Sequence, residues 1–166
     1  VLDEAALARI LELPYVASAR PVGRSTHRRG GCLSEPAPHG LSLGQLDQAG
    51  VIRLHERGFT GDGVVIGVLD TGFELDHPCF AGIAVAASWD FVGNDGDVGY
   101  TPGDPVGTGD HGTRVLSIMA GNEPGVYVGG APEAEFILAR TEDISDEYAQ
   151  EEDYWVFGLE WCEGEG

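Results

Sequence analysis

The sequence predicts an α/β fold in which helices cover a mostly parallel sheet. Two short apolar segments, residues 64–69 and 136–139, run without polar alternation, as strands buried on both faces of a parallel sheet do. Helical patterns lie between and after them, and strands that alternate with helices are typical of this architecture. A chain of 166 residues provides for one such core.

The first elements are expected before residue 64. Residues 1–13 place apolar side chains near one helical face, and residues 15–22 have the pattern of a short strand. Residues 23–39 are polar and rich in Gly, Pro and Arg, as linkers are. Residues 42–57 are expected to form helical turns with Gly50 as a weak point. The side chains expected to pack from these turns are Leu43, Leu46, Ile52 and Leu54.

The later elements alternate along the chain. Residues 83–92 are expected to form a strand, and residues 93–110 a loop dense in Gly and Asp. A helix is expected over residues 112–120, followed by a Gly/Pro-rich connection over residues 121–132. Residues 147–162 are predicted to form an amphipathic helix. Its apolar positions include Trp155, Leu159 and Trp161.

Charge and composition exclude several classes of partner. The chain has 28 acidic residues and nine basic ones, all of them arginine, for a net charge of −19. Such a field repels phosphate backbones, so no nucleic acid partner is expected. No apolar run approaches the ~20 residues that cross a bilayer, so no membrane span is expected. The three cysteines, Cys32, Cys79 and Cys162, form no CxxC pair and are expected to be free thiols.

Asp70 is the first candidate for chemistry. It stands where the apolar strand ends, and Thr71 and Gly72 follow it. A carboxylate at the carboxyl end of a parallel strand lies where open α/β sheets bind ligands, and a glycine allows a sharp turn there. An aspartate after a strand more commonly caps the next turn. Both interpretations stay open from this segment alone.

His111 is the second candidate, and it lies where the Gly/Asp loop becomes a helix. An imidazole there suits a general base, although a histidine at a helix start can also have no chemical role. Asp70 and His111 are 41 positions apart, and their connections fit two neighbouring strand ends of one sheet. An aspartate that accepts the Nδ1–H of a histidine fixes its tautomer and stabilises the imidazolium. The pair therefore predicts acid–base chemistry.

Four motifs follow one another over about residues 40–166. They are Val-Val-Ile-Gly-Val-Leu-Asp-Thr-Gly at 64–72, His-Gly-Thr at 111–113, Gly-Ala-Pro at 130–132 and Gly-Leu-Glu-Trp at 158–161. In this order they resemble the motifs of the subtilisin-like serine proteases, peptidase family S8. Asp76-His77-Pro78 also follows the first motif at that family's usual interval.

The resemblance implies a domain plan and two catalytic roles. Residues 1–22 resemble the tail of an inhibitory propeptide, 23–39 form the linker, and 40–166 resemble the N-terminal part of the peptidase domain. The implied architecture is the three-layer fold of the family, incomplete in this chain. Asp70 is then the orienting acid and His111 the general base.

The activity implied is that of a serine endopeptidase that cleaves polypeptide substrates. The parent protein is expected to be secreted or exported, with its own propeptide segment as a partner. We expect the signal peptide to be hidden by a missing N-terminus. The oxyanion-hole asparagine and the Gly-Thr-Ser nucleophile motif of the family are absent, so the chain alone is expected to be inactive. The serines without that context are Ser18, Ser25, Ser34, Ser42, Ser88, Ser117 and Ser145.

Two other functions remain alternatives. The first is a catalytically inactive relative or fragment that acts as a binding module. The second is a metal-dependent hydrolase, although no established ligand spacing supports it. Its candidate ligands are Asp70, Asp76, His77, Asp110 and His111.

No cofactor is expected to be required for the chemistry. Many members of the family bind structural calcium through an aspartate after His-Pro; here that residue is Cys79, so calcium is possible but unsupported. Oxygen donors between Asn94 and Asp104 suit another ion, although solvation is the favoured explanation. The acidic run over residues 142–153 borders the substrate cleft in the family, which suggests basic substrates. A solvated helix face is the favoured explanation there too.

Overall fold

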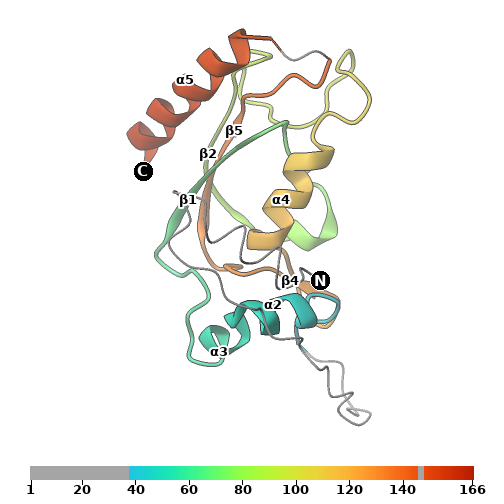
Figure 1. Ribbon diagram of the computed structural model, residues 1–166, viewed down its shortest axis with the longest axis vertical. Coiled ribbons are helices and arrows are strands. Elements are labelled where there is room, and N and C mark those ends of the chain that lie inside the picture. The colour runs from blue at the N-terminus through green and yellow to red at the C-terminus, as the bar shows by residue number, and fades with distance from the viewer. Residues whose placement is uncertain (1–37, 146–147) are drawn as a thin grey trace, which may run out of the picture. The chain divides into compact units, whose positions relative to one another are not determined.

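The computed structural model describes residues 38–145 and 148–166. The helix expected over 1–13, the strand over 15–22 and most of the linker lie outside these residues. The described elements, labelled in Figure 1, are α2 (Leu43–Ala49), α3 (Val51–His55), β1 (Val65–Asp70), the 3-10 turn η1 (Pro78–Phe80), β2 (Ala84–Asp90), α4 (Asp110–Ala120), β3 (Asn122–Glu123), β4 (Tyr127–Val128), β5 (Glu135–Arg140) and α5 (Gln150–Glu165).

The main sheet is parallel, which confirms the expected fold class. Its strand order is β1-β5-β2, so the last strand in the sequence lies between the first two. The register aligns Asp70 and Asp90 with Arg140 of the central strand. Three charged residues therefore end three adjacent strands at the same edge. A short antiparallel hairpin, β3–β4, lies within the connection that the sequence had suggested only as Gly/Pro-rich.

Helices α4 and α5 lie on opposite sides of this sheet (Figure 1). Because side chains alternate between the faces of a strand, Val68 and Leu138 join Leu116 of α4 in the buried core. On the other face, a Cβ built on Gly67 of β1 lies 3.4 Å from Sγ of Cys162 in α5. The described part of the chain thus has three layers: helix, sheet, helix.

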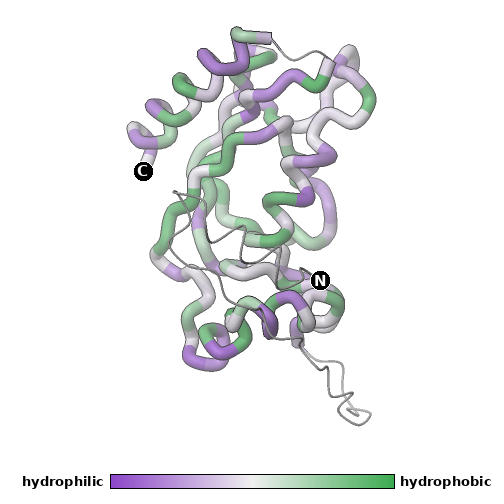
Figure 2. Tube along the Cα trace, viewed as in Figure 1, coloured by the Kyte–Doolittle hydropathy of each residue, from purple (hydrophilic) through white to green (hydrophobic). Residues whose placement is uncertain are grey.

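The contact of α5 with the sheet differs from the predicted amphipathic packing. Trp155 and Phe157 are 53% and 55% exposed, and Gly158 is the buried residue of this helix. A Cβ at Gly158 would lie 2.8 Å from Cγ2 of Thr141, so the bare glycine lets the helix approach the sheet closely. Polar and apolar residues alternate along α5 without forming one stripe (Figure 2). The amphipathic prediction was wrong because α5 contacts the sheet through its backbone at Gly158 rather than through an apolar face.

Two further burial predictions were partly wrong. Val65 is 46% exposed, because it lies at the start of β1, which forms an edge of the described sheet. In the first helical region, Gly50 with φ 78° separates α2 from α3, as its weak-point position suggested. Leu46 packs inside, but Leu54 is 47% exposed.

The thiols and membrane propensity agree with the sequence expectations where they are described. Cys79 is buried and free, and Cys162 is half-buried and free. None of the helices in residues 38–145 and 148–166 combines the length and apolar character needed to cross a bilayer.

Candidate active site

Asp70 is the last residue of β1 and is 4% exposed. The backbone N–H of Thr71 donates to its Oδ1 at 2.7 Å, and the Thr71 hydroxyl donates to the same oxygen at 3.1 Å. Both donors belong to the next residue, whereas a turn-capping aspartate bonds the backbone two residues on. They fix the carboxylate and leave it able to accept another donor. The bonds of Asp70 therefore do not favour the turn-capping interpretation.

His111 supplies that donor from the first turn of α4. Its Nδ1 lies 2.8 Å from Oδ1 and 2.9 Å from Oδ2 of Asp70. Because a carboxylate can only accept hydrogen bonds, Nδ1 carries the proton, and Nε2 of the neutral ring has a free lone pair. The His111 side chain is 65% exposed, whereas that of Asp70 is 6% exposed. The imidazole is thus anchored at one nitrogen and open to solvent at the other.

Two glycines allow α4 to approach the end of β1. Gly72 has φ 115°, which favours glycine, and a Cβ there would lie 2.8 Å from the Val98 carbonyl oxygen. A Cβ on Gly112 would overlap the carbonyl oxygen of Gly72 and lie 3.0 Å from Cβ of Asp70. The Gly112 N–H donates to the Thr71 hydroxyl at 3.3 Å. The close contact between α4 and the end of β1 therefore requires the glycines of the Asp-Thr-Gly and His-Gly motifs.

The sequence prediction placed Asp70 and His111 at two neighbouring strand ends, and that detail was wrong. Strand β5 separates β1 from β2 in the sheet. His111 reaches Asp70 from a helix that follows the long loop after β2. The sequence signal for the pair was correct in residue identity and incorrect in topology, because the order of the strands is not written in any local pattern.

The loop that leads to His111 is held by a buried arginine. Arg140, 2% exposed, donates from Nη1 to Oδ2 of Asp90 and from Nη2 to Oδ1 of Asp104, each at 3.0 Å. Burial opposes ionisation of Asp104, but hydrogen bonds from Arg140 and Thr101 outweigh it and lower the pKa of this carboxyl. The sequence did not identify this cluster.

The other acidic groups of that loop bind backbone. Oδ1 of Asp95 accepts the N–H of Asp97, and Oδ1 of Asp97 accepts the N–H of Gly99, at 2.8 and 3.0 Å. Asp104 is occupied by Arg140. These oxygens therefore have protein partners, and bound calcium stays an untested expectation.

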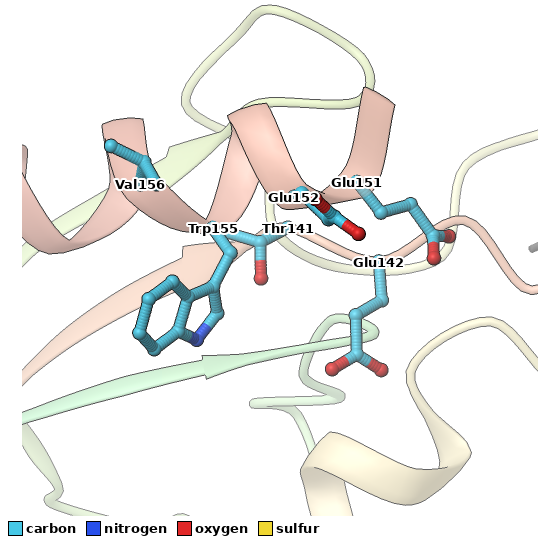
Figure 3. Close-up of a pocket in the computed structure, with 6 residues that line it drawn as sticks. All are labelled: Thr141, Glu142, Glu151, Glu152, Trp155 and Val156. Atoms are coloured by element: carbon cyan, nitrogen blue, oxygen red, sulfur yellow. The ribbon is translucent and has the colours of Figure 1, made fainter. Parts of the chain in front are cut away.

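A pocket of about 610 Å³ lies beside the pair, between the end of β5 and the first half of α5. Its six lining residues are drawn in Figure 3: Thr141, Glu142, Glu151, Glu152, Trp155 and Val156. Desolvation raises the pKa of Glu142, the charges of Asp70 and Glu151 raise it further, and that of His111 opposes them. The pocket is therefore electrostatically linked to Asp70 and His111.

The remaining candidate ligands and nucleophiles do not join this site. Nδ1 of His77 lies 3.1 Å from Sγ of Cys79, and both Asp76 and Asp110 are exposed. Within the described residues, no three His, Cys, Asp or Glu side chains cluster as a metal site would require. The structure thus offers no support for the metal-dependent alternative.

The serine hydroxyls whose bonds are described face backbone instead of His111. Those of Ser42, Ser88 and Ser117 donate to the carbonyl oxygens of Val128, Gly96 and Arg114 respectively. Ser117, which lies on α4 with His111, thus has a backbone partner rather than the imidazole.

Comparisons with known proteins identify relatives of this chain. The subtilase family, peptidase S8, matches residues 61–155. The minor extracellular protease Vpr of Bacillus subtilis is 41% identical over 86 residues, which cover 50% of this chain and 10% of that protein. Thermitase of Thermoactinomyces vulgaris is 36% identical over 85 residues, covering 51% of this chain and 28% of that protein.

A third relative and a solved structure extend the comparison. The subtilisin-like protease PopC of Myxococcus xanthus is 33% identical over 117 residues, covering 63% of this chain and 23% of that protein. The crystal structure of the Aeromonas sobria serine protease with its chaperone has 28% identity and a TM-score of 0.47, over 61% of this chain and 16% of that chain.

The chain spans between a tenth and just over a quarter of the length of these curated relatives. The family match nevertheless covers more than half of the chain, from residue 61 to residue 155, and includes both Asp70 and His111. The chain belongs to the subtilase family.

Proposed function

We propose that the protein carrying this chain is a serine-type endopeptidase, and that Asp70 and His111 supply the acid and base of its catalytic triad. One observation carries the proposal: a buried carboxylate holds Nδ1 of His111 while the rest of the ring is open. This is the arrangement that a general base needs, with one nitrogen oriented and the other free to receive a proton.

The proposed chemistry follows from that orientation. Nε2 of His111 takes the proton from a serine hydroxyl as the serine oxygen attacks the peptide carbonyl, and Asp70 stabilises the resulting imidazolium. His111 then gives the proton to the leaving amine as the C–N bond breaks, and water releases the acyl group from the serine. The serine and the oxyanion donors are proposed to come from a segment that this sequence does not contain.

Secretion, polypeptide substrates and an internal propeptide partner belong to the same proposal. The Bacillus subtilis relative is named as an extracellular protease, which supports export. The propeptide assignment concerns residues 1–22, which lie outside the described part of the chain. The domain boundary at 22 also lies outside it, and the boundary at 39 lies at its start. These boundaries remain predictions.

A catalytically inactive relative is the second candidate. It is favoured by one observation: the described hydroxyls of Ser42, Ser88 and Ser117 bond to backbone carbonyls and leave Nε2 of His111 without a serine partner. Such a protein would keep the pair as a relic and bind peptides without cleaving them.

Labelling by a fluorophosphonate, which reacts with activated serines, separates the two candidates. We expect the protein that carries this chain to be labelled and to hydrolyse casein. His111→Ala should lower kcat by about 10⁶-fold, because triad members act as a unit. The exposed His77→Asn variant keeps an acceptor at the start of η1 and should retain full activity. No labelling of the unmutated protein would support the inactive alternative.

A further inference from the structure

The pocket beside Asp70 and His111 has an unusual lining for its position. Of the six residues that line it, three are glutamates: Glu142 from the end of β5, and Glu151 and Glu152 from the first turn of α5. Its volume of about 610 Å³ falls in the range of pockets that enclose ligands. An arginine or lysine side chain fits within it.

The lining carries negative charge without a matching cation. Among residues 38–145 and 148–166, the ion pairs are those of His111 with Asp70 and of Arg140 with Asp90 and Asp104. None of them involves the pocket glutamates. Oε1 of Glu151 accepts the N–H of Asp143 at 3.0 Å, which leaves Glu142 and Glu152 for a ligand. Burial raises the pKa of Glu142, and the nearby charges of Asp70 and Glu151 raise it further, against that of His111.

A second, independent observation comes from Thr141. This residue is 1% exposed, and its hydroxyl oxygen has no hydrogen-bond partner among the described residues. A buried hydroxyl left without a partner is unfavourable. In Figure 3 the hydroxyl points into the space between the Trp155 indole and the Glu142 carboxylate. It can accept a hydrogen bond from an N–H donor placed there.

Trp155 adds a preference for an organic cation. Its indole is an apolar surface whose face attracts a guanidinium or ammonium group. No group of metal-ligating side chains is assembled in the described part of the chain, so an inorganic ion has less support. Carboxylates, an indole face and a hydroxyl acceptor together match the long side chain of arginine or lysine.

A backbone hydrogen bond joins the pocket to Asp70, the partner of His111. The N–H of Thr141 donates to the carbonyl oxygen of Asp70 at 3.0 Å. A side chain held in the pocket therefore belongs to a residue close to the peptide bond that His111 would serve.

We propose that this pocket binds a basic side chain of the polypeptide substrate, with Glu142, Glu152, Trp155 and Thr141 as the groups that select it. The identity of the ligand as a substrate rests on the proposed function; the binding of a basic peptide side chain does not. The proposal thereby differs from the sequence interpretation of the acidic run, which favoured a solvated helix face.

The test measures equilibrium binding of two acetylated and amidated pentapeptides to the full chain by isothermal titration calorimetry. Both have alanine at four positions; one has arginine at the centre and the other citrulline, which is nearly isosteric and uncharged. We expect the arginine peptide to bind about tenfold more tightly, as a charge-assisted hydrogen bond provides. Equal binding of the two peptides, or binding of neither, would overturn the proposal.

Two charge-matched variants locate the effect. Glu142→Gln should reduce the arginine preference to less than about twofold. Glu163→Gln removes the same charge from an exposed position near the other end of α5, about 16 Å along the helix from Glu152, and should leave the preference intact. Equal losses in both variants would assign the preference to net charge and contradict the pocket. Thr141→Val should weaken binding of the arginine peptide by several-fold.

Failure of this proposal and failure of the proposed function give different results. A protein that prefers the arginine peptide but is not labelled by fluorophosphonate keeps the pocket and loses the peptidase. A protein that is labelled and hydrolyses casein, yet binds both peptides equally, keeps the peptidase and loses the pocket.

Discussion

The carboxyl edge of the sheet carries two charged clusters of similar composition and opposite character. In the first, Asp70 holds His111, whose side chain is 65% exposed. In the second, Arg140 holds Asp90 and Asp104, and the side chains of the three are 2%, 3% and 16% exposed. We call the first the open cluster, because it ends in a solvent-exposed imidazole. We call the second the closed cluster, because its charged groups pair with one another.

The register shows how the two clusters are kept apart. Asp70 and Arg140 are aligned neighbours on adjacent strands, and a direct ion pair between them would compete with His111 for the Asp70 carboxylate. The donors of Arg140 go instead to Asp90 and Asp104, while Asp70 accepts from Thr71 and His111. A buried charge that pairs with other buried charges supports structure, whereas one that bonds an exposed titratable ring is available for chemistry.

Among the variants that compare the two clusters, the largest expected effect comes from Asp70→Asn. An asparagine amide offers the imidazole an N–H as well as an oxygen, so it no longer enforces the Nδ1–H tautomer. In the protein that carries this chain, kcat for casein hydrolysis should fall by about 10⁴-fold. The control, Asp76→Asn, alters an exposed carboxylate and should change kcat by less than about twofold. Similar losses in both variants would contradict a special role for Asp70.

The second cluster should respond in stability. Arg140→Met leaves Asp90 and Asp104 without their buried cation, and breaking such a pair costs about 3–5 kcal/mol of unfolding free energy. Urea denaturation followed by circular dichroism measures the loss. Arg53→Met, which changes an exposed arginine, should stay within about 0.5 kcal/mol of the unmutated chain. A loss below that limit for Arg140→Met would show that the cluster is not stabilising.

The backbone contact that brings α4 to β1 is tested by Gly112→Ala. The added Cβ collides with the Gly72 carbonyl, and overpacking of this kind costs about 1–3 kcal/mol. Displacement of α4 should also lower kcat. Gly164→Ala is the control, because a Cβ at Gly164 in α5 meets nothing within 4 Å. It should stabilise the helix by up to about 1 kcal/mol; equal destabilisation by both substitutions would contradict the role of the contact.

The smallest expected effect is a pH dependence of the closed cluster. The folded pKa of Asp104 is lower than its ordinary value of 3.8, so below 3.8 the unfolded chain binds protons first. The stability that Asp104 contributes is therefore complete above pH 3.8 and is lost as the pH falls through its folded pKa. Thermal unfolding between about pH 5 and pH 2 should show a steeper decline for the unmutated chain than for Asp104→Asn. Parallel curves would contradict this coupling.

The sequence predicted the open cluster and missed the closed one, for a physical reason. Asp70 and His111 lie in motifs whose neighbouring glycines are required by the local geometry, so the requirement is visible in consecutive residues. Arg140 pairs with Asp90 and Asp104 across 50 and 36 positions of chain. Only the strand order β1-β5-β2 brings them together, and no local pattern encodes that order.

The same reasoning explains the helix α5 and its acidic residues. A search for apolar periodicity cannot find a helix seated through Gly158, because a glycine adds nothing to the apolar face. Glu142 and Glu152 belong to one acidic run in the sequence, but they line a pocket because β5 and α5 lie next to each other there. Parallel architecture and helix positions were predictable; contacts between segments were not.

The most direct test of the account is the protonation state of the two His111 nitrogens. Long-range proton–nitrogen correlation spectra of histidine-labelled chain, recorded at about pH 9 where histidine is neutral, identify which nitrogen carries the proton. We expect Nδ1–H with an unprotonated Nε2 in the unmutated chain, and loss of that preference in Asp70→Asn. A His111 ring protonated at Nε2, or unaffected by Asp70→Asn, would contradict the claim that Asp70 orients His111 as a base.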